Sequence, residues 1–366
     1  MTKIPVYQPS LSGREKEYVI DCLDSTWISS KGEYINRFEQ EFSKKIGVNH
    51  AITVSNGTVA LHLALIALGI SSEDEVIVPS LTYIASVNAI SYTGAHPIFV
   101  DSLYDTWQMD PNDIIKKITP RTRAIMVVHL YGHPCDMDAI MQIASEHNLY
   151  VIEDCAEAFG SKYKENVVGS IGDIATFSFF GNKTITTGEG GMVVTNSSSL
   201  AEKVMHYKGQ GLAKNREYWH DVIGYNYRMT NICAAIGLAQ IEQANDFIYR
   251  KREIATRYRQ HLSECPIEVH HDFLDGLHTY WMVSVLTNNI QDRDKLRTYL
   301  ANNGIETRPL FYPIHTMPMY SNQPYHCPIA EDLAQRGINL PSWPAMTNQQ
   351  QDLVIHTIRQ YFQEQP

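Results

Sequence analysis

The sequence predicts an α/β fold with a mainly parallel central sheet and a smaller C-terminal α+β unit. Short β-branched runs alternate with helical stretches through the first two thirds of the chain, which is the pattern of right-handed β-α-β units in a sheet covered on both faces. A long charged stretch and a final third with fewer strand-like runs follow. A chain of 366 residues has room for one large and one smaller domain.

The alternation begins near residue 51, where each strand-like run is followed by a helical one. Strands are expected at 51–55, 75–80, 97–101, 124–132, 149–154, 174–180 and 190–196. Helices are expected at 57–69, 82–94, 109–118 and 137–148. Ligands of such a sheet bind at the carboxyl ends of its strands.

The segment 231–262 predicts one long helix or two joined helices that bridge the domains. The remainder combines one strand-like run with two helical runs, at 279–287, 292–304 and 347–365. We therefore expect a large domain over 1–245 and a small C-terminal domain over 246–366.

Composition narrows the class of protein. Hydrophobic residues make up 44% and charged residues 19%, no apolar run is long enough to cross a bilayer, and no secretion signal is evident, so a soluble cytoplasmic protein is expected. The net charge of -10 argues against nucleic-acid binding. Six scattered cysteines without a CxxC pair indicate reduced thiols.

A phosphate site is one interpretation of the segment Ser55–Thr58, which lies between an expected strand and an expected helix. Free N–H groups and the positive end of the helix dipole suit a phosphate there, and Gly57 lets the backbone approach it closely. The same residue types are also common helix caps.

Two ionisable residues follow later strands. Asp154 ends an apolar run, where it either meets solvent or faces a ligand. Lys183 follows the strand-like run 174–180 among Gly, Thr and Asn residues, where its amine could be partly desolvated beside an aldehyde. Ser178 could donate to a phosphate, and Tyr83 could stack on a flat ring, although core packing would also explain Tyr83.

Five ordered segments carry a resemblance to a known family: SNGTVALHLAL, PSLTYIASVNA, DCAEAFG, SFFGNKTITTGEGG and YNYRMTN. In order and spacing they resemble the DegT/DnrJ/EryC1/StrS sugar aminotransferases, and the resemblance covers nearly the whole chain. It implies the fold-type-I architecture of pyridoxal-phosphate (PLP) enzymes, similar to that of aspartate aminotransferase. No metal is implied.

The resemblance assigns roles to individual residues. Lys183 matches the Schiff-base lysine, Asp154 the partner of the pyridine nitrogen, and Tyr83 the stacking aromatic. Further cofactor contacts are implied for Gly57, Thr58, Glu157, Ser178 and Asn226. Asn226 matches an asparagine that reaches the phosphate of the neighbouring subunit, so the resemblance implies a homodimer, or a dimer of dimers, with shared active sites.

The implied reaction has two halves. L-Glutamate, the usual donor of the family, would leave its amino group on the cofactor with Lys183 as the base, and a nucleotide-linked keto-sugar would then take it up. The segments 4–42 and 304–320 are most similar to members that aminate C4 of GDP-4-keto-6-deoxy-D-mannose for bacterial O-antigen synthesis. UDP- or dTDP-linked keto-sugars are the alternative. Candidate substrate contacts are Trp27, Ser29, Tyr312 and His315, although surface or packing roles would also explain each of them.

Other functions fit the sequence less well. A PLP-dependent sugar 3-dehydratase of the same fold has histidine where Lys183 stands, and a non-catalytic regulator would not need Lys183 and Asp154 together. A dinucleotide-binding dehydrogenase is disfavoured because the glycine pair Gly209 and Gly211 lacks the third glycine and a preceding strand.

Two further alternatives concern single residues. A metal hydrolase would need more than His129 and His133, which lack an adjacent glutamate on a helix. A thiol nucleophile at Cys155 is disfavoured because alternation along the strand directs it into packing, without an evident base.

Overall fold

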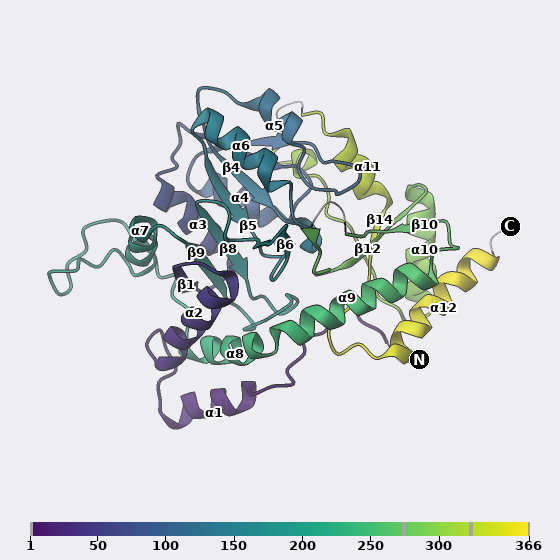
Figure 1. The fold of residues 1–366 in the computed structure, drawn as a ribbon, viewed down its shortest axis with the longest axis horizontal. Coiled ribbons are helices and arrows are strands. Elements are labelled where there is room, and N and C mark those ends of the chain that lie inside the picture. Colours follow the sequence, from purple (N-terminus) through teal and green to yellow (C-terminus); the bar gives the residue numbers. More distant parts are fainter. Residues whose placement is uncertain (1–2, 273–275, 322–324, 365–366) are drawn as a thin grey trace.

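The computed structural model describes residues 3–272, 276–321 and 325–364. It contains a large unit around a seven-stranded sheet and a smaller unit around a four-stranded sheet, and the helix pair α8–α9 runs along both (Figure 1). Among the described residues, no helix has the length and apolar character required to cross a membrane. All six cysteines are free.

The large sheet has the strand order β1-β9-β8-β5-β4-β2-β3. Its strands are β1 (His50–Val54), β2 (Glu75–Pro79), β3 (His96–Val100), β4 (Thr122–Val128), β5 (Tyr150–Asp154), β8 (Ile174–Ser178) and β9 (Gly191–Thr195). The pairs from β3 through β8 are parallel, and β9 is antiparallel to both of its neighbours. This arrangement confirms the predicted α/β class with a mainly parallel sheet.

Helices cover both faces of this sheet, because alternate strand residues enter different cores. Val76 and Val78 of β2 belong to one apolar cluster, whereas Ile77 belongs to another. The first face is covered by α3 (Gly57–Leu68), α4 (Ile84–Tyr92) and α7 (Ser198–Lys208). The other is covered by α2 (Glu33–Ile46), α5 (Pro111–Lys117), α6 (Met137–His147) and α8 (Asn231–Glu242), with α1 (Glu15–Asp24) packed on α8.

The smaller unit is an antiparallel sheet with helices. Its strands, in spatial order, are β10 (Ile267–Val269), β12 (Val283–Thr287), β14 (Gly337–Leu340) and β13 (Arg308–Pro309). Its helices are α9 (Ala244–His261), α10 (Ile290–Asn302), α11 (Pro328–Arg336) and α12 (Asn348–Glu364). The N-terminal segment joins this unit, since Ile4 pairs in parallel with Ile305. The helix expected over 347–365 is α12, and Gln365 lies outside the described residues.

Short elements complete the chain. A small sheet is formed by β11 (Gly276–Leu277), β6 (Lys162–Tyr163) and β7 (Asn166–Val167), and single 3-10 turns are η1 (Leu130–Gly132) and η2 (Ile314–Thr316). The segment between α7 and α8 extends away from the body of the large unit (Figure 1).

The bridge expected over 231–262 consists of two joined helices, α8 and α9, which meet at Gln243. The expected domain limit between residues 245 and 246 falls in the first turn of α9. Phe247 still packs in the large unit, whereas Ile254 and Tyr258 pack in the small one. The proposed limits therefore lie within a helix whose two halves serve different cores.

Close packing of α8 on α2 generates a stability prediction. A Cβ atom added at Gly237 would lie 2.6 Å from Cε1 of Phe38, so Gly237→Ala should destabilise the protein by about 1–3 kcal/mol through overpacking. Gly181→Ala is the control, because no atom lies within 4 Å of the added methyl group. Thermal unfolding of both variants measures this, and equal melting temperatures would contradict the proposed tight contact.

Candidate active site

A cavity of about 640 Å³ lies at the carboxyl edge of the parallel strands. Strands β5 and β8 end beside it at Asp154 and Ser178, and the helices α3 and α4 begin there. Its wall contains seven of the eight predicted cofactor residues, namely Gly57, Thr58, Tyr83, Asp154, Glu157, Ser178 and Lys183. The parallel topology brings these residues together, although they are spread over more than a hundred positions of the sequence.

The N-terminus of α3 forms one end of the cavity. The side chain of Asn56 caps the helix by accepting a hydrogen bond from the Val59 N–H (3.0 Å), and the first N–H groups of a helix have no partner inside it. A Cβ atom on Gly57 would lie 2.7 Å from Cβ of Ser178, so only glycine fits between the strand end and the helix start. Backbone N–H groups, a hydroxyl and the helix dipole thus converge on an anion-sized site.

Asp154 is a buried carboxylate on the wall, with 4% of its surface exposed. Its oxygens accept hydrogen bonds from the Ser86 hydroxyl (2.7 Å) and the Ala156 N–H (3.0 Å). Burial raises the pKa of Asp154, although these bonds and the Lys183 amine oppose the rise. A cationic ring nitrogen beside it would stabilise the ionised carboxylate.

Lys183 and Glu157 face each other across the same cavity, with 3.8 Å between Nζ and Oε1. Burial lowers the pKa of the Lys183 amine, and the two carboxylates nearby oppose this effect. A neutral fraction of the amine is what a nucleophile or base requires. Burial raises the pKa of Glu157 to about 7, and its Oε2 accepts a hydrogen bond from the Tyr131 N–H (2.8 Å).

These groups fit a PLP molecule. The helix start suits its phosphate, Asp154 suits its ring nitrogen and Lys183 suits its aldehyde, and all three lie on one cavity wall. Tyr83, half-exposed and with its ring centroid 5.5 Å from that of Phe311, supplies an aromatic surface beside the same space. The individual contacts remain predictions.

The other predicted residues lie outside this cavity. Asn226 is exposed in the segment between α7 and α8, where its Oδ1 accepts from Arg228 (3.1 Å). Trp27, Ser29 and Tyr312 are exposed. His315 is buried, and its ring nitrogens contact Ser80 (2.6 Å) and Glu331 (3.2 Å). Substrate contact by these four residues therefore stays a prediction, and for His315 it requires a change of partners.

Residues of the small unit on the cavity wall were missed from sequence. Trp281 lies just before β12, Arg308 is in β13 and Asn339 is in β14. Arg308 and Lys183 are the cationic side chains on the described wall. The sequence predicts a strand over 279–287, but no motif indicates that Trp281 in this run lines a cavity.

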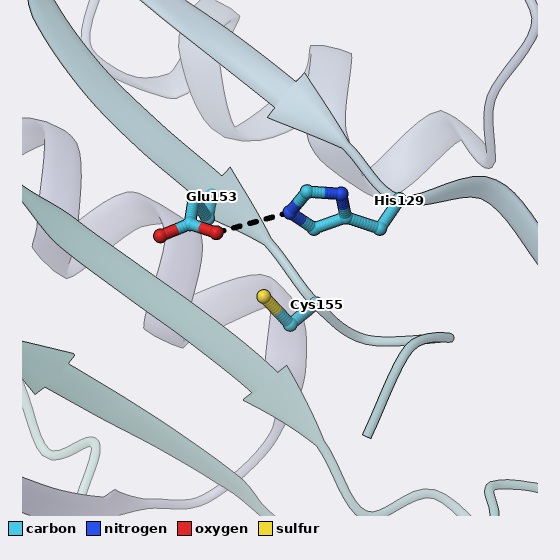
Figure 2. A group of neighbouring side chains, drawn as sticks. All are labelled: His129, Glu153 and Cys155. Carbon is cyan, nitrogen blue, oxygen red and sulfur yellow. Dashed lines mark hydrogen bonds and ion pairs between the residues drawn. The ribbon is translucent and has the colours of Figure 1, made fainter. Parts of the chain in front are cut away.

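A second group of polar side chains lies in the core below the strand ends. Figure 2 shows His129, Glu153 and Cys155 together, and His129 Nε2 is 3.1 Å from Glu153 Oε2. His129 Nδ1 accepts from the Cys135 N–H (3.1 Å), so its Nε2 donates to Glu153. Burial opposes ionisation of Glu153, but His129 and backbone N–H groups of Gly169 and Gly172 outweigh it and lower its pKa. The two nitrogens and the carboxylate are thus already bonded within the protein.

The remaining alternatives find no support in this arrangement. His133 packs against His270 and His278, and its ring centroid is 5.4 Å from that of each. Burial raises the pKa of Cys155 well above its ordinary value, so the thiol is protonated and a poor nucleophile. Gly209 follows helix α7 rather than a strand, which disfavours a dinucleotide-binding loop.

Comparison with known proteins agrees with this geometry. The model of the DegT/DnrJ/EryC1/StrS aminotransferase family matches residues 9–359. GDP-perosamine synthase of Escherichia coli O157:H7 is 65% identical, with 100% of both chains covered, and that of Vibrio cholerae is 50% identical, covering 98% of this chain and 99% of its own. A protein of Streptococcus pneumoniae, solved in a PLP form, superposes with a TM-score of 0.94 at 26% identity, covering 99% of each chain.

The fold and cavity are therefore those of a PLP-dependent aminotransferase. The chain belongs to the DegT/DnrJ/EryC1/StrS aminotransferase family.

The raised pKa of Glu157 generates a prediction for the cofactor-free protein. The folded state holds the proton up to about pH 7, whereas the unfolded chain releases it near the ordinary glutamate pKa. The stability contributed by neutral Glu157 is therefore present below that lower value and is lost as the pH rises to 7. Glu157→Gln should gain stability relative to the wild type between about pH 5 and pH 8.

Chemical denaturation across this range measures the difference. Glu165→Gln is the control, because Glu165 is exposed. A stability difference between Glu157→Gln and the wild type that does not change with pH would contradict the assigned ionisation.

Proposed function

We propose that the protein transfers the amino group of L-glutamate to C4 of GDP-4-keto-6-deoxy-D-mannose, which gives 2-oxoglutarate and GDP-perosamine for O-antigen synthesis. The observation that carries the proposal is a lysine, an aspartate and a helix start placed around one cavity in a chain that is 65% identical over its full length to a GDP-perosamine synthase. We further propose that it acts in the cytoplasm.

The residues of the cavity divide the chemistry among them. When bound, PLP supplies an electrophilic carbon and an electron-accepting ring that stabilises negative charge at the donor's α carbon. Asp154, whose oxygens are fixed by Ser86 and Ala156, would hold a proton on the ring nitrogen. The start of α3 and Ser178 would anchor the phosphate.

Lys183 would move the protons. Its amine is partly desolvated and lies between two carboxylates, so in neutral form it would take the proton from the α carbon of L-glutamate. In the second half-reaction the same amine would return a proton to C4 of the sugar. Arg308, on the opposite unit, offers a positive charge to an anionic substrate group.

Shared active sites form part of the proposal. The segment between α7 and α8 projects from the subunit (Figure 1) and carries Asn226 together with highly exposed apolar side chains, including Tyr218 at 93% and Ile223 at 87%. Exposed apolar surface of this kind is typical of a protein interface. We propose that this segment packs on a second subunit of a homodimer, or of a dimer of dimers, where Asn226 reaches the partner's phosphate site.

Absorption spectroscopy tests the reaction. The visible band of PLP bound to the protein should disappear on addition of L-glutamate and return on addition of GDP-4-keto-6-deoxy-D-mannose, because each substrate completes one half-reaction. Lys183→Ala is the control and should fold, yet show neither change. If only a UDP- or dTDP-linked keto-sugar restores the band, the GDP-sugar assignment is wrong, and an active Lys183→Ala variant would remove the role of that lysine.

Subunit mixing tests the sharing of sites. Lys183→Ala and Asn226→Asp homodimers should each have greatly reduced activity, the second because a carboxylate would repel the phosphate. Unfolding and refolding them together should restore activity, because each hybrid dimer has one site with both native residues. Absence of recovery in verified hybrids would mean that Asn226 serves the site of its own subunit.

A further inference from the structure

The backbone around Lys183 is held from outside the large unit. The carbonyl oxygen of Lys183 accepts a hydrogen bond from the hydroxyl of Tyr7 (2.7 Å), and the carbonyl oxygen of Asn182 accepts one from the indole N–H of Trp281 (2.6 Å). Tyr7 belongs to the N-terminal segment, and Trp281 precedes β12 of the small unit. Two successive carbonyls at the catalytic lysine are therefore fixed by two aromatic side chains from distant parts of the chain.

Trp281 also lies beneath the reactive amine. Nζ of Lys183 is 3.9 Å from the indole ring centroid, within the range of a cation–π contact. The indole is 4% exposed and is stacked with Tyr131 and Phe311, at interplanar angles of 11° and 28°. Packing thus fixes the plane of the indole ring, so the face that it presents to the Lys183 amine has a fixed orientation.

The buried amine of Lys251 holds the tryptophan in turn. Nζ of Lys251 donates to the carbonyl oxygens of Trp281 (3.1 Å) and Ser342 (2.8 Å) and to the Ser342 hydroxyl (2.7 Å). Lys251 is fully buried, all three acceptors are uncharged, and burial lowers its pKa well below the ordinary value. Its Nζ also lies 5.5 Å from the centroid of the Tyr7 ring. Lys251 of α9 therefore contacts both aromatic residues, Tyr7 and Trp281, that donate to the backbone at Lys183.

We propose that Tyr7 and Trp281 are positioning residues that direct the Lys183 amine during proton transfer, and that Lys251 fixes them to the small unit. This role rests on the proposed function of Lys183. It explains how the side chain of that lysine is kept in place. The hydrogen bonds set the backbone from which the side chain extends. The indole face stabilises the amine once it has taken up a proton. Asp154 and Glu157 act on the same amine from the large unit.

Three substitutions separate the effect of the two hydrogen bonds from the effect of the indole face. Tyr7→Phe and Trp281→Phe each remove one hydrogen bond, and Trp281→Phe retains an aromatic face. Each should slow the glutamate half-reaction about tenfold, with the KM for glutamate within about twofold of the wild type. Trp281→Leu also removes the face, so it should lower the pH at which the visible band of bound PLP titrates by about half a unit, whereas the two Phe variants leave it unchanged.

Tyr258→Phe is the matched control. It removes a buried tyrosine hydrogen bond to a backbone carbonyl, that of Pro341 (2.9 Å), in the same unit but without contact to Lys183. It should lower the melting temperature as Tyr7→Phe does, yet react at the wild-type rate. If the Tyr7 and Trp281 variants also react at that rate and titrate as the wild type does, the positioning role is wrong.

A separate pair of substitutions tests whether Lys251 fixes the aromatic pair to the small unit. Lys251→Met should slow the half-reaction as Trp281→Phe does, and Ser342→Ala, which removes one acceptor, should do so more weakly and still fold. Wild-type rates in a folded Ser342→Ala or Lys251→Met variant would restrict the inference to the aromatic pair and overturn the role of Lys251. Failure of wild-type protein to react with glutamate would instead overturn the proposed donor, because the titration of Trp281→Leu needs no donor.

Discussion

The burial of ionisable groups around one cavity is the constraint on which the rest of the site depends. Asp154, Glu157 and Lys183 lie where water is scarce, and an isolated charge in such a place is costly. Each carboxylate is therefore bonded to fixed donors, from Ser86, Ala156 and Tyr131. The same burial moves the pKa values of the lysine and the glutamate toward neutrality, where proton transfer is efficient.

The large unit supplies one wall of this cavity because its parallel strands end at a common edge. Gly191 of β9 pairs with Val54 of β1 and with Ser178 of β8, which brings the start of α3 beside the end of β8. The small unit supplies the opposite wall through Trp281, Arg308 and Asn339. The cavity therefore lies between the parallel sheet and a second sheet that is connected to it through α8 and α9.

Much of this arrangement could be predicted from sequence. Alternating strand and helix patterns gave the parallel sheet, and strand ends marked Gly57, Asp154 and Ser178, because local periodicity determines which residues leave the sheet at its edge. Tyr7, Trp281 and Lys251 could not be found in this way. Tyr7 is 176 positions from Lys183, and no local pattern records which distant side chains meet. His315 is a candidate substrate contact from sequence, but the fold buries it in η2 between Ser80 and Glu331, and no local pattern indicates these distant partners.

The bond from Tyr7 to Lys183 has a consequence for the order of folding. The seven-stranded sheet uses residues 50–195, but the turn that carries Lys183 is completed only by Tyr7 and by Trp281. During synthesis the N-terminal segment can pair with Ile305 only after the large sheet has been made, because Ile305 follows it in the chain. A ribosome-bound chain with a finished large sheet but no small unit would still lack the bond from Trp281 beside Lys183. Completion of the turn around Lys183 is thus a late, long-range event that requires both units to have docked.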